Sequence, residues 1–477
     1  MTEGHLAELT AADVSFLRDE HGGAHMHVGG IAVFRGAAPP IDEIRAHVLR
    51  RLARVPRYRM RLVHPPYGLG RPAWATDPSF NLEYHVRHVG LPAPGGEEEL
   101  RAAAARIFSQ RLDRTKPLWE LWVLEGVGRD RFAIVTKSHH ALVDGVVAVD
   151  LMTALLDPEG QDGDAAEAPV APLPAPPLPS DAQLLLATAK AGGRQLLAAP
   201  ARLLGDAARR PVDGLRRSRE AVGDAIRRVR VGAASAPPSP LNVPIGPHRR
   251  ISRVGVPLGD LKRVKDTFGG SVNDVVLAAV TGALRHWMRD RGLRTAEIEL
   301  RAAVPVAIEG RGDGPRPISL VYAPLPVGEP DPVARLERIR RATSEALAEK
   351  RPVAAEQLAA AESFAPPSVL AQASRLPLAA ARFNLMVTNI PGPQVPMHLL
   401  GRRMVTMVPV PFLSPGRSLA VAVMSYGGTA EFGLLGDLDK LPDLDAIGGG
   451  IEQAVAELLD LVAEGRPGPR RRAARGR

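Results

Sequence analysis

The chain has 477 residues, and its 61 Lys and Arg against 52 Asp and Glu give a net charge of +9. A hydrophobic content of 45% with 24% charged residues excludes a disordered chain, and the length predicts two domains. The sequence contains no cysteine, which excludes disulfides, thiolate nucleophiles and cysteine-based metal sites.

The basic excess is confined to two segments. Residues 181–230 hold eleven Lys and Arg against five acids, and residues 466–477 hold six arginines and no acid. The rest of the chain sums to about −3. Such patches attract anionic lipid, nucleic acid or anionic cofactors, and charge alone does not choose among them.

Neither a secretory signal nor a membrane span is predicted. The first sixteen residues begin acidic and lack the basic-then-apolar pattern of a signal peptide. The longest uncharged run, Phe383 to Leu400, contains two asparagines, three prolines and a glycine, which favours strand and turn. We expect a cytoplasmic protein.

Residues 1–158 are predicted to form the first domain, of mixed α/β type. Short apolar runs at 29–36 and 120–126 predict strands, and residues 97–112 have helical spacing. Within that helix, Leu100, Ala104, Ile107 and Leu112 are expected on one face. A further strand at 132–138 leads through a loop into a helix at 146–157.

The two domains are joined by two segments of different composition. Residues 159–180 are rich in Pro and Ala and predict a semi-rigid, extended linker. Residues 181–235 predict a basic helical connector, interrupted at Pro200 and Pro211. Its helices either bridge the domains or lie as amphipathic helices on a lipid surface, and the pattern leaves both open.

Residues 236–465 are predicted to form a second mixed domain, followed by a disordered Arg-rich tail at 466–477. The spacing of Val276, Val280, Leu284 and Trp287 or Met288 predicts a helix over 271–290. A second helix is expected over 451–465, with Gly465 as its stop. Strands are predicted at 299–308, 319–327, 383–390 and 418–428.

The stretch SHHALVDG, residues 138–145, carries the clearest chemistry. Successive strand side chains point to opposite faces, so one histidine can face a cleft while its neighbour packs inward. This geometry argues against a shared metal ion and favours one exposed base, since an imidazole can take a proton at neutral pH. Asp144 is expected to orient the loop, and Gly145 permits tight packing beside it. Two buried structural histidines are the alternative.

No cysteine and no G-x-S-x-G serine is present to act as a covalent nucleophile. Direct attack by a substrate hydroxyl, deprotonated by histidine, is therefore the simpler mechanism.

HHALVDG matches the H-H-x-x-x-D-G motif of acyltransferases related to chloramphenicol acetyltransferase and to peptide-synthetase condensation domains. Within that superfamily the chain most resembles the bacterial wax ester synthase/diacylglycerol acyltransferases. Other matching stretches follow in the same order over about residues 8 to 462: LTAADVSFL, HMHVGG, KPLWELWVLEG, LNVPIGPHRR, SVNDVVLAA, TNIPGP and SYGGTAEFGLLGD.

The resemblance implies roles for particular residues. His140 would be the general base, with His139 and Asp144 holding the site in shape. The PLW motif (Pro117, Leu118, Trp119) would lie on the substrate-binding side of the first domain. The ND motif (Asn273, Asp274) would support the active site from the second domain, and Arg301 is a candidate partner for Asp144.

Three of these residues have simpler interpretations. Trp119 could be a core residue, Asn273 the N-cap of the following helix, and Arg301 a structural or surface arginine. The family's usual SYNG is SYGG here, which removes one polar side chain and leaves the acceptor preference open.

The implied fold is α+β, with two chloramphenicol-acetyltransferase-like domains, each a mostly antiparallel or mixed sheet with helices, and an active-site channel between them. The implied activity is transfer of a long-chain acyl group from acyl-CoA to diacylglycerol or a fatty alcohol, without metal, prosthetic group or covalent acyl-enzyme. The basic segments would suit peripheral contact with a membrane or lipid droplet, and no nucleic-acid motif is present. A carrier-protein-linked donor, or a non-catalytic lipid-droplet-binding protein, are the alternatives.

Overall fold

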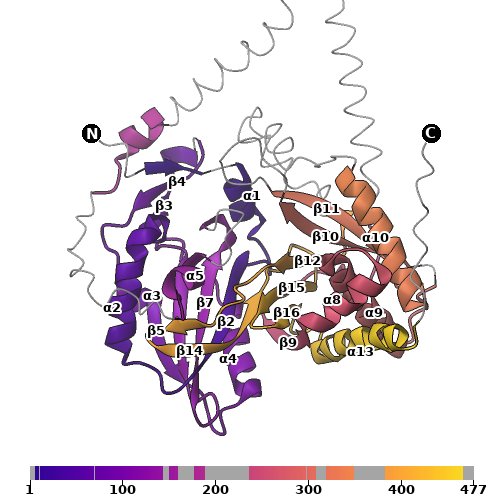
Figure 1. Cartoon of the computed structure of the whole chain (residues 1–477). Coiled ribbons are helices and arrows are strands. Elements are labelled where there is room, and N and C mark those ends of the chain that lie inside the picture. Colours follow the sequence, from indigo (N-terminus) through magenta and orange to yellow (C-terminus); the bar gives the residue numbers. More distant parts are fainter. Residues whose placement is uncertain are drawn as a thin grey trace, which may run out of the picture.

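The computed structural model describes residues 6–9, 11–68, 70–142, 150–159, 177–187, 236–296, 298–307, 318–348 and 382–465. Two lobes lie side by side, each built on a β-sheet with helices packed against it (Figure 1). Most of the predicted linker and basic connector, together with the tail, lie outside these residues.

The first lobe contains a seven-stranded sheet with the order β5-β6-β7-β2-β14-β13-β8. Strands β14 and β13 come from the second half of the chain, and β14 pairs antiparallel with β2, so that Val408 lies opposite Ile31. The predicted domain ranges assign residues 397–410 to the second domain, and so do not account for the pairing of β13 and β14 with the sheet of the first lobe. The strands are β5 (Val86–Gly90), β6 (Trp119–Glu125), β7 (Arg131–His139), β2 (His27–Arg35), β14 (Arg402–Val410), β13 (Met397–Leu399) and β8 (Asp157–Pro158).

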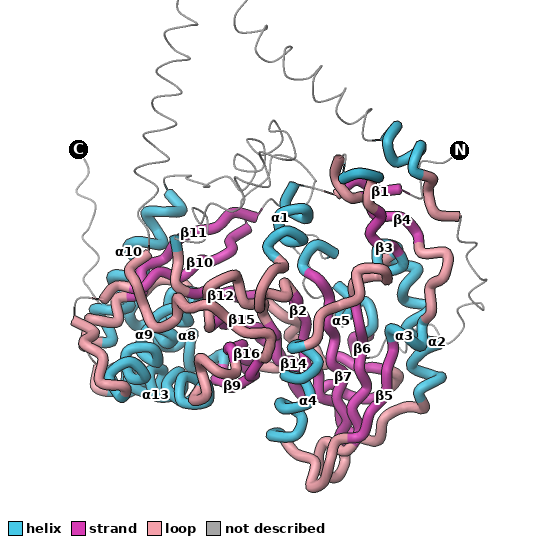
Figure 2. Tube along the Cα trace, turned by 180° about the vertical axis from the view of Figure 1, so that it is seen from behind, coloured by secondary structure: helices cyan, strands magenta, loops and turns pink. Residues whose placement is uncertain are grey.

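The second lobe contains a six-stranded mixed sheet with the order β11-β10-β12-β15-β16-β9. Within the described residues, four helices pack on it (Figure 2). The central one, α9, is buried along most of its length. The strands are β11 (Ile318–Leu325), β10 (Leu300–Ala307), β12 (Leu385–Ile390), β15 (Leu419–Tyr426), β16 (Thr429–Asp437) and β9 (Arg249–Pro257), and the helices are α8 (Leu258–Phe268), α9 (Val272–Asp290), α10 (Pro332–Ala348) and α13 (Leu444–Ala463).

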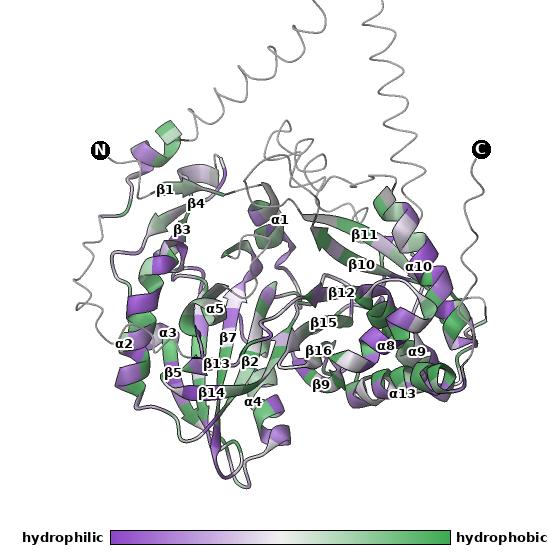
Figure 3. Ribbon diagram, viewed as in Figure 1, coloured by the Kyte–Doolittle hydropathy of each residue, from purple (hydrophilic) through white to green (hydrophobic). Residues whose placement is uncertain are grey.

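The remaining elements surround the first lobe. A small sheet of β1, β4 and β3 packs Val63 and Ala73 against Leu184, which belongs to a short helix at 181–187. In Figure 3, β10 and β11 are drawn mainly in green, whereas outer helices such as α2 carry both colours. The elements are β1 (Leu6–Glu8), β3 (Met60–Val63), β4 (Ala73–Thr76), α1 (Ala11–Asp19), α2 (Ile41–Arg51), α3 (Leu82–His85), α4 (Glu97–Ser109) and α5 (Asp150–Leu155).

The predicted strands are confirmed, but the helix predicted over 97–112 ends at Ser109. The next residue, Gln110, is extended, with ψ 137°. The ammonium group of Lys137 donates to the carbonyl oxygens of Ile107 and Gln110 at 3.0 and 3.1 Å, and so caps the helix end. Including Leu112 in the helix was therefore wrong, although its side chain is buried.

Helix α13 ends near Gly465 as predicted but begins at Leu444, before the glycine-rich stretch 448–450. A Cβ at Gly450 would lie 3.0 Å from Cα of Ala283 in α9, and one at Gly448 would lie 3.1 Å from Oγ of Ser252 in β9. These glycines permit close packing, which outweighs their low helix propensity.

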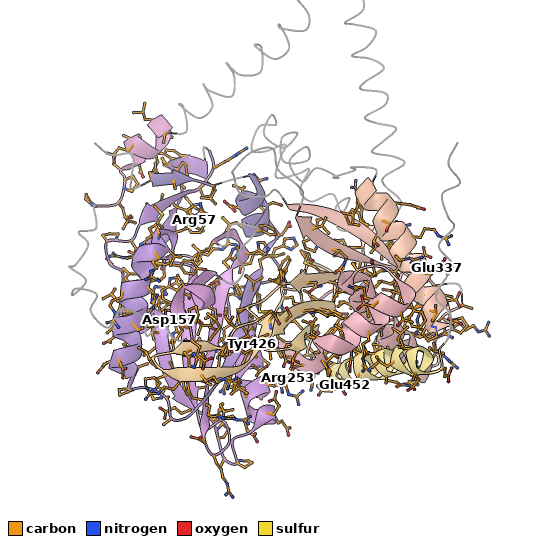
Figure 4. The ribbon with its side chains drawn as sticks, viewed as in Figure 1. Arg57, Asp157, Arg253, Glu337, Tyr426 and Glu452 are labelled. Carbon is orange, nitrogen blue, oxygen red and sulfur yellow. The ribbon has the colours of Figure 1, made fainter. Side chains whose placement is uncertain are left out.

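Charged and apolar contacts join the lobes. Arg253 of β9 lies where they meet (Figure 4), with its Nε 2.7 Å from Oε1 of Glu97 in α4 and its Nη1 3.4 Å from Oε2 of Glu431. One apolar cluster combines Ile31 of β2 with Leu435 of β16 in the second lobe. The lobes therefore share part of their core.

No single helix of the described residues is long and apolar enough to cross a membrane. Only α8 and α9 together meet the length and composition, and they are bent by 101° at the break between them.

Candidate active site

The histidine motif lies where β7 ends. The strand finishes at His139, and a 3-10 turn over His140–Leu142 follows. The N–H of His140 donates to the carbonyl of Met26 at 2.8 Å. Met26 has φ +49°, a left-handed conformation that costs energy for a non-glycine residue. Asp144 and Gly145 lie outside the described residues.

The ring of His140 is held between two phenylalanines. Phe16 of α1 stacks on it at 4.0 Å between ring centroids, and Phe412, just beyond β14, meets it edge-on at 5.1 Å. Burial, followed by the neighbouring His139, lowers the pKa of His140 to about 4. The imidazole is therefore neutral at pH 7, the state that can accept a proton.

His139 is almost fully buried, and its hydrogen bonds fix the position of its proton. Its Nδ1 accepts the N–H of Ala141 at 3.0 Å. A backbone N–H can only donate, so a neutral His139 carries its proton on Nε2. That nitrogen faces Oε2 of Glu20 at 3.6 Å, an electrostatic contact longer than a formed hydrogen bond.

Glu20 is the centre of a buried polar cluster that the sequence did not predict. Arg114 donates to Oε2 of Glu20 from Nε at 2.9 Å and from Nη2 at 2.5 Å, and Nε2 of His27 lies 3.5 Å from Oε1. Burial alone would raise the pKa of Glu20, but His139, His27 and Arg114 hold it well below its usual range. Burial also lowers the pKa of His27 to about 3.

Arg249, in the stretch LNVPIGPHRR, connects the second lobe to the loop before β2. Its guanidinium donates to the carbonyls of Gly23 and Gly246. A Cβ at Gly23 would lie only 2.2 Å from the carbonyl oxygen of Ile245, so only glycine allows this approach. Gly23 lies three residues before Met26, which bonds the backbone of His140.

The PLW motif supports the histidines from within the core. Trp119 is fully buried, donates from Nε1 to the carbonyl of Tyr58 at 2.6 Å and stacks on His85 at 4.5 Å. The carbonyl of Leu118 accepts the N–H of His139 at 2.9 Å, and Pro117 is also buried. These contacts are structural.

The ND motif forms the start of α9. Ser271 is the N-cap, so the alternative that Asn273 caps this helix was wrong. Asp274 accepts from N and Oγ of Ser271, both at 2.8 Å, in a capping box, and its other oxygen accepts from Oγ1 of Thr343 at 2.7 Å.

A cavity of about 460 Å³ opens beside this helix start. Its walls combine apolar side chains of β10, β11 and α10 with polar ones of α9, α10 and β12, and neither His139 nor His140 lines it. The lining residues are Gly270, Ser271, Asn273, Asp274, Val304, Pro305, Val306, Val321, Thr343, Ser344, Leu347 and Asn389.

Arg301 lies half-buried on β10. Its N–H donates to Oδ1 of Asn384 at 2.7 Å, and its carbonyl accepts the N–H of Asn384 at 2.8 Å. Its predicted partner, Asp144, lies outside the described residues, so that pairing stays a prediction.

The SYGG stretch ends β15 in a two-residue hairpin turn, with Tyr426 paired to Thr429. Gly427 and Gly428 both have positive φ, +55° and +86°, as a type I′ turn requires. Asparagine suits the first of these positions as well, and a Cβ there meets no atom within 4 Å. The departure from SYNG therefore preserves the turn.

Sequence reasoning missed Phe16, Glu20, Arg249 and Phe412. The first three lie in or beside the quoted stretches LTAADVSFL and LNVPIGPHRR, but no local pattern shows where their side chains meet. Within the described part of the chain, no group of three or more His, Asp or Glu side chains is arranged to hold a metal ion.

Comparison with known proteins identifies two family models. Residues 9–276 match the wax ester synthase/diacylglycerol acyltransferase catalytic domain, and residues 317–459 match the C-terminal domain of the same family. A probable diacylglycerol O-acyltransferase of Mycobacterium tuberculosis is 32% identical over 473 residues, which cover 98% of each chain. A putative diacylglycerol O-acyltransferase of Mycobacterium bovis matches to the same extent.

Solved structures agree with the expected α+β fold. The wax ester synthase/diacylglycerol acyltransferase of Marinobacter aquaeolei is 27% identical, with a TM-score of 0.67, covering 96% of this chain and 100% of that one. The first condensation domain of the calcium-dependent antibiotic synthetase shares the fold at 18% identity, with a TM-score of 0.58 and coverage of 96% and 97%. The chain therefore belongs to the wax ester synthase/diacylglycerol acyltransferase family.

Proposed function

We propose that this acyltransferase moves a long-chain acyl group from acyl-CoA to a lipid alcohol, with His140 as the general base. The observation that carries the proposal is the setting of His140: a neutral imidazole between Phe16 and Phe412, which pack in an apolar cluster with Met386 of the second lobe. Apolar walls suit lipid substrates, and the neutral ring can take a hydroxyl proton.

In the proposed reaction, the acceptor hydroxyl oxygen attacks the thioester carbonyl carbon while His140 takes its proton. The tetrahedral oxyanion collapses, the C–S bond breaks, and the protonated His140 returns the proton to the departing thiolate. In this reaction Nε2 of His140 takes the hydroxyl proton, so the neutral ring carries its own proton on Nδ1, which is buried. The reaction uses acyl-CoA as co-substrate and no prosthetic group.

The acceptor is proposed to be diacylglycerol, a fatty alcohol or both, giving triacylglycerol or wax ester. The proteins matched above carry both names, and the diacylglycerol O-acyltransferases cover nearly the whole chain. The cavity beside α9 offers further apolar wall in the second lobe.

The test is to incubate the purified chain with palmitoyl-CoA and either hexadecanol or dioleoylglycerol, and to measure ester and free CoA together. We expect equal amounts of ester and CoA, and the ratio of the two esters gives the acceptor preference. CoA release without ester would contradict transfer to these alcohols. Ester formed only from an acyl group on a carrier protein would favour the condensation-type alternative.

We also propose that the enzyme works at an anionic lipid surface. Besides the connector and tail, residues 44–76 contain eight arginines and no acid; Arg45 and Arg51 are paired with acids outside this range, and Tyr67 is 92% exposed. Arg57 lies in the upper part of the first lobe (Figure 4). Each arginine near an anionic surface contributes about 1 kcal/mol.

Vesicle flotation tests this surface. Binding to vesicles with anionic phospholipid, absent with neutral vesicles and weakened in Arg54→Gln/Arg57→Gln, is the expected result. Equal binding to both kinds of vesicle would contradict it.

A further inference from the structure

Glu20 is a buried acid with no role in the mechanism above, although it lies close to the histidine pair. It follows the last residue of α1, the helix that also carries Phe16. Its side chain is only 3% exposed, yet it faces three basic side chains from three different parts of the chain. Such a charge needs compensation, and its cost suggests a function.

Arg114 compensates only one of the two carboxylate oxygens. Both of its hydrogen bonds to Glu20 go to Oε2. Its Nη2 also donates to the carbonyl of Leu17 at 2.8 Å, and this bond stabilises the end of α1. Oε1 has no hydrogen-bond partner among the described residues, and Nε2 of His27 is 3.5 Å away. The carboxylate therefore keeps negative charge directed toward the two imidazoles.

We propose that Glu20 is a positioning residue for this reaction: its carboxylate holds His139 as the Nε2-protonated tautomer and thereby holds the turn that carries His140. Nε2 of His139 faces the carboxylate, and Nδ1 receives the N–H of Ala141, the residue after His140. The opposite tautomer would place its Nδ1 proton against that N–H.

The charges around Glu20 support this assignment. Arg114, His27 and His139 face the carboxylate directly. Two further basic residues, His25 and Lys137, interact with it electrostatically from a greater distance. Burial lowers the pKa of His27 to about 3 and that of His25 to about 4, so both are neutral at pH 7. Arg114 is then the permanent cation in direct contact, and the acid remains ionised.

Glu20→Gln removes the charge but keeps the size of the side chain. A neutral amide attracts the Nε2 proton of His139 less strongly than a carboxylate does, so the Ala141 bond weakens and His140 shifts between its phenylalanines. A misplacement of about 1 Å can cost about 100-fold in rate. We expect a kcat about 10- to 100-fold lower, with KM for acyl-CoA changed by less than about twofold.

The matched control is Glu431→Gln. Glu431 is also buried, at 6% exposure, and is bound by Thr406 and Arg253 rather than by histidine. Its kcat should stay within about twofold of wild type. A Glu20→Gln enzyme as active as this control would overturn the proposal.

A double-mutant cycle separates positioning from general support of α1. If Glu20 acts through His139, adding Glu20→Gln to His139→Gln should lower kcat no further. Losses that multiply would show that Glu20 supports the helix independently, and would overturn the proposal.

A measurement on the unmutated protein does not depend on activity, and it uses a variant only to assign one signal. Nitrogen-15 histidine spectra should show His139, identified by its absence in His139→Gln, protonated on Nε2 at pH 7. Protonation on Nδ1, or on both nitrogens, would overturn the proposal. The expected loss of rate rests on the proposed function, whereas the expected tautomer does not. If His139 shows the expected tautomer but the enzyme forms no ester, the proposed function is contradicted and the positioning of the turn is still supported.

Discussion

The histidine site of the first lobe and the cavity of the second lobe are built in opposite ways. Around His140 the fold buries titratable groups, among them Glu20 and His27, and accepts a left-handed Met26. Beside the cavity, the polar residue Asp274 has its oxygens occupied by Ser271 and Thr343. Among the described residues, the first region keeps a buried acid with one unbonded oxygen and a strained backbone residue, whereas the buried acid beside the cavity has both oxygens bonded.

This difference separates two kinds of motif. Strain and buried charge are kept where they serve chemistry, whereas a capping box stabilises a helix start in any protein. HHALVDG is thus a candidate for catalysis, whereas the start of SVNDVVLAA is interpreted as a structural helix cap. Four perturbations test the contrast, from the largest expected effect to the smallest.

Acid should weaken the first lobe before the second. The described residues include six histidines whose pKa is lowered by burial. All six lie in the first half of the chain, and those with a pKa near 4 include His25 and His85. A histidine with a lowered folded pKa protonates more readily when unfolded, so stability falls as pH drops from about 6.5 to about 4. Each imidazole with a pKa near 4 lowers the free energy of unfolding by about 2 kcal/mol at pH 5.

Hydrogen exchange at pH 7 and pH 5, corrected for intrinsic rates, measures this. Protection should fall more in β2 and β7 than in α9 and α13. An equal loss of protection in both lobes would contradict the expected difference in acid sensitivity between them.

Asp274→Ala should lower stability rather than chemistry. It removes three accepted hydrogen bonds, from N and Oγ of Ser271 and from Thr343, at a cost of about 2 kcal/mol. Chemical denaturation gives the free energy of unfolding, and kcat per folded molecule should stay within about threefold. Asn273→Ala, which leaves the cap intact, is the control, and a large kcat loss at preserved stability would assign Asp274 to the active site.

Trp119→Phe tests whether the PLW motif touches substrate. The indole N–H bonded to Tyr58 is lost and a buried carbonyl is left without its donor, which costs about 1 to 2 kcal/mol. KM for acyl-CoA should not change. A tenfold rise in KM without loss of stability would place Trp119 on the substrate side, as the family resemblance implies.

Gly427→Asn restores the family's usual residue and should have the smallest effect. Asparagine tolerates φ +55°, and the added side chain meets no neighbour, so stability should change by less than about 0.5 kcal/mol. The triacylglycerol-to-wax-ester ratio should not move. Gly427→Ala, strained at this φ, is the control, and a changed ratio with asparagine would assign this turn to acceptor selection.

Local pattern predicted much of the fold. The strand leading to His139 and the helix over 271–290 follow from periodicity alone, because each buries one face or is wholly buried. The first turns of α13 could not be predicted from periodicity, because Gly448 and Gly450 lower the helix propensity of this stretch. Their close packing against β9 and α9, which favours the helix, depends on the tertiary fold.

The parts joined by long-range pairing were beyond sequence reasoning. Nothing in residues 397–410 indicates that this hairpin completes the sheet of the first lobe, yet that crossing brings Phe412 to His140. The contact of Glu20 with His139 likewise spans more than a hundred residues. The motif was enough to identify the histidine proposed to react, whereas the residues around it could be identified only from the fold.

The central claim is that His140, rather than the surrounding fold, supplies the chemistry. Single-turnover transfer from palmitoyl-CoA to an accepted lipid alcohol, in wild type and in His140→Ala, tests it most directly. The account predicts that the variant stays folded and binds acyl-CoA, but forms ester about 10²- to 10⁴-fold more slowly. A folded variant that forms ester at the wild-type rate would contradict it, and would make the two histidines structural.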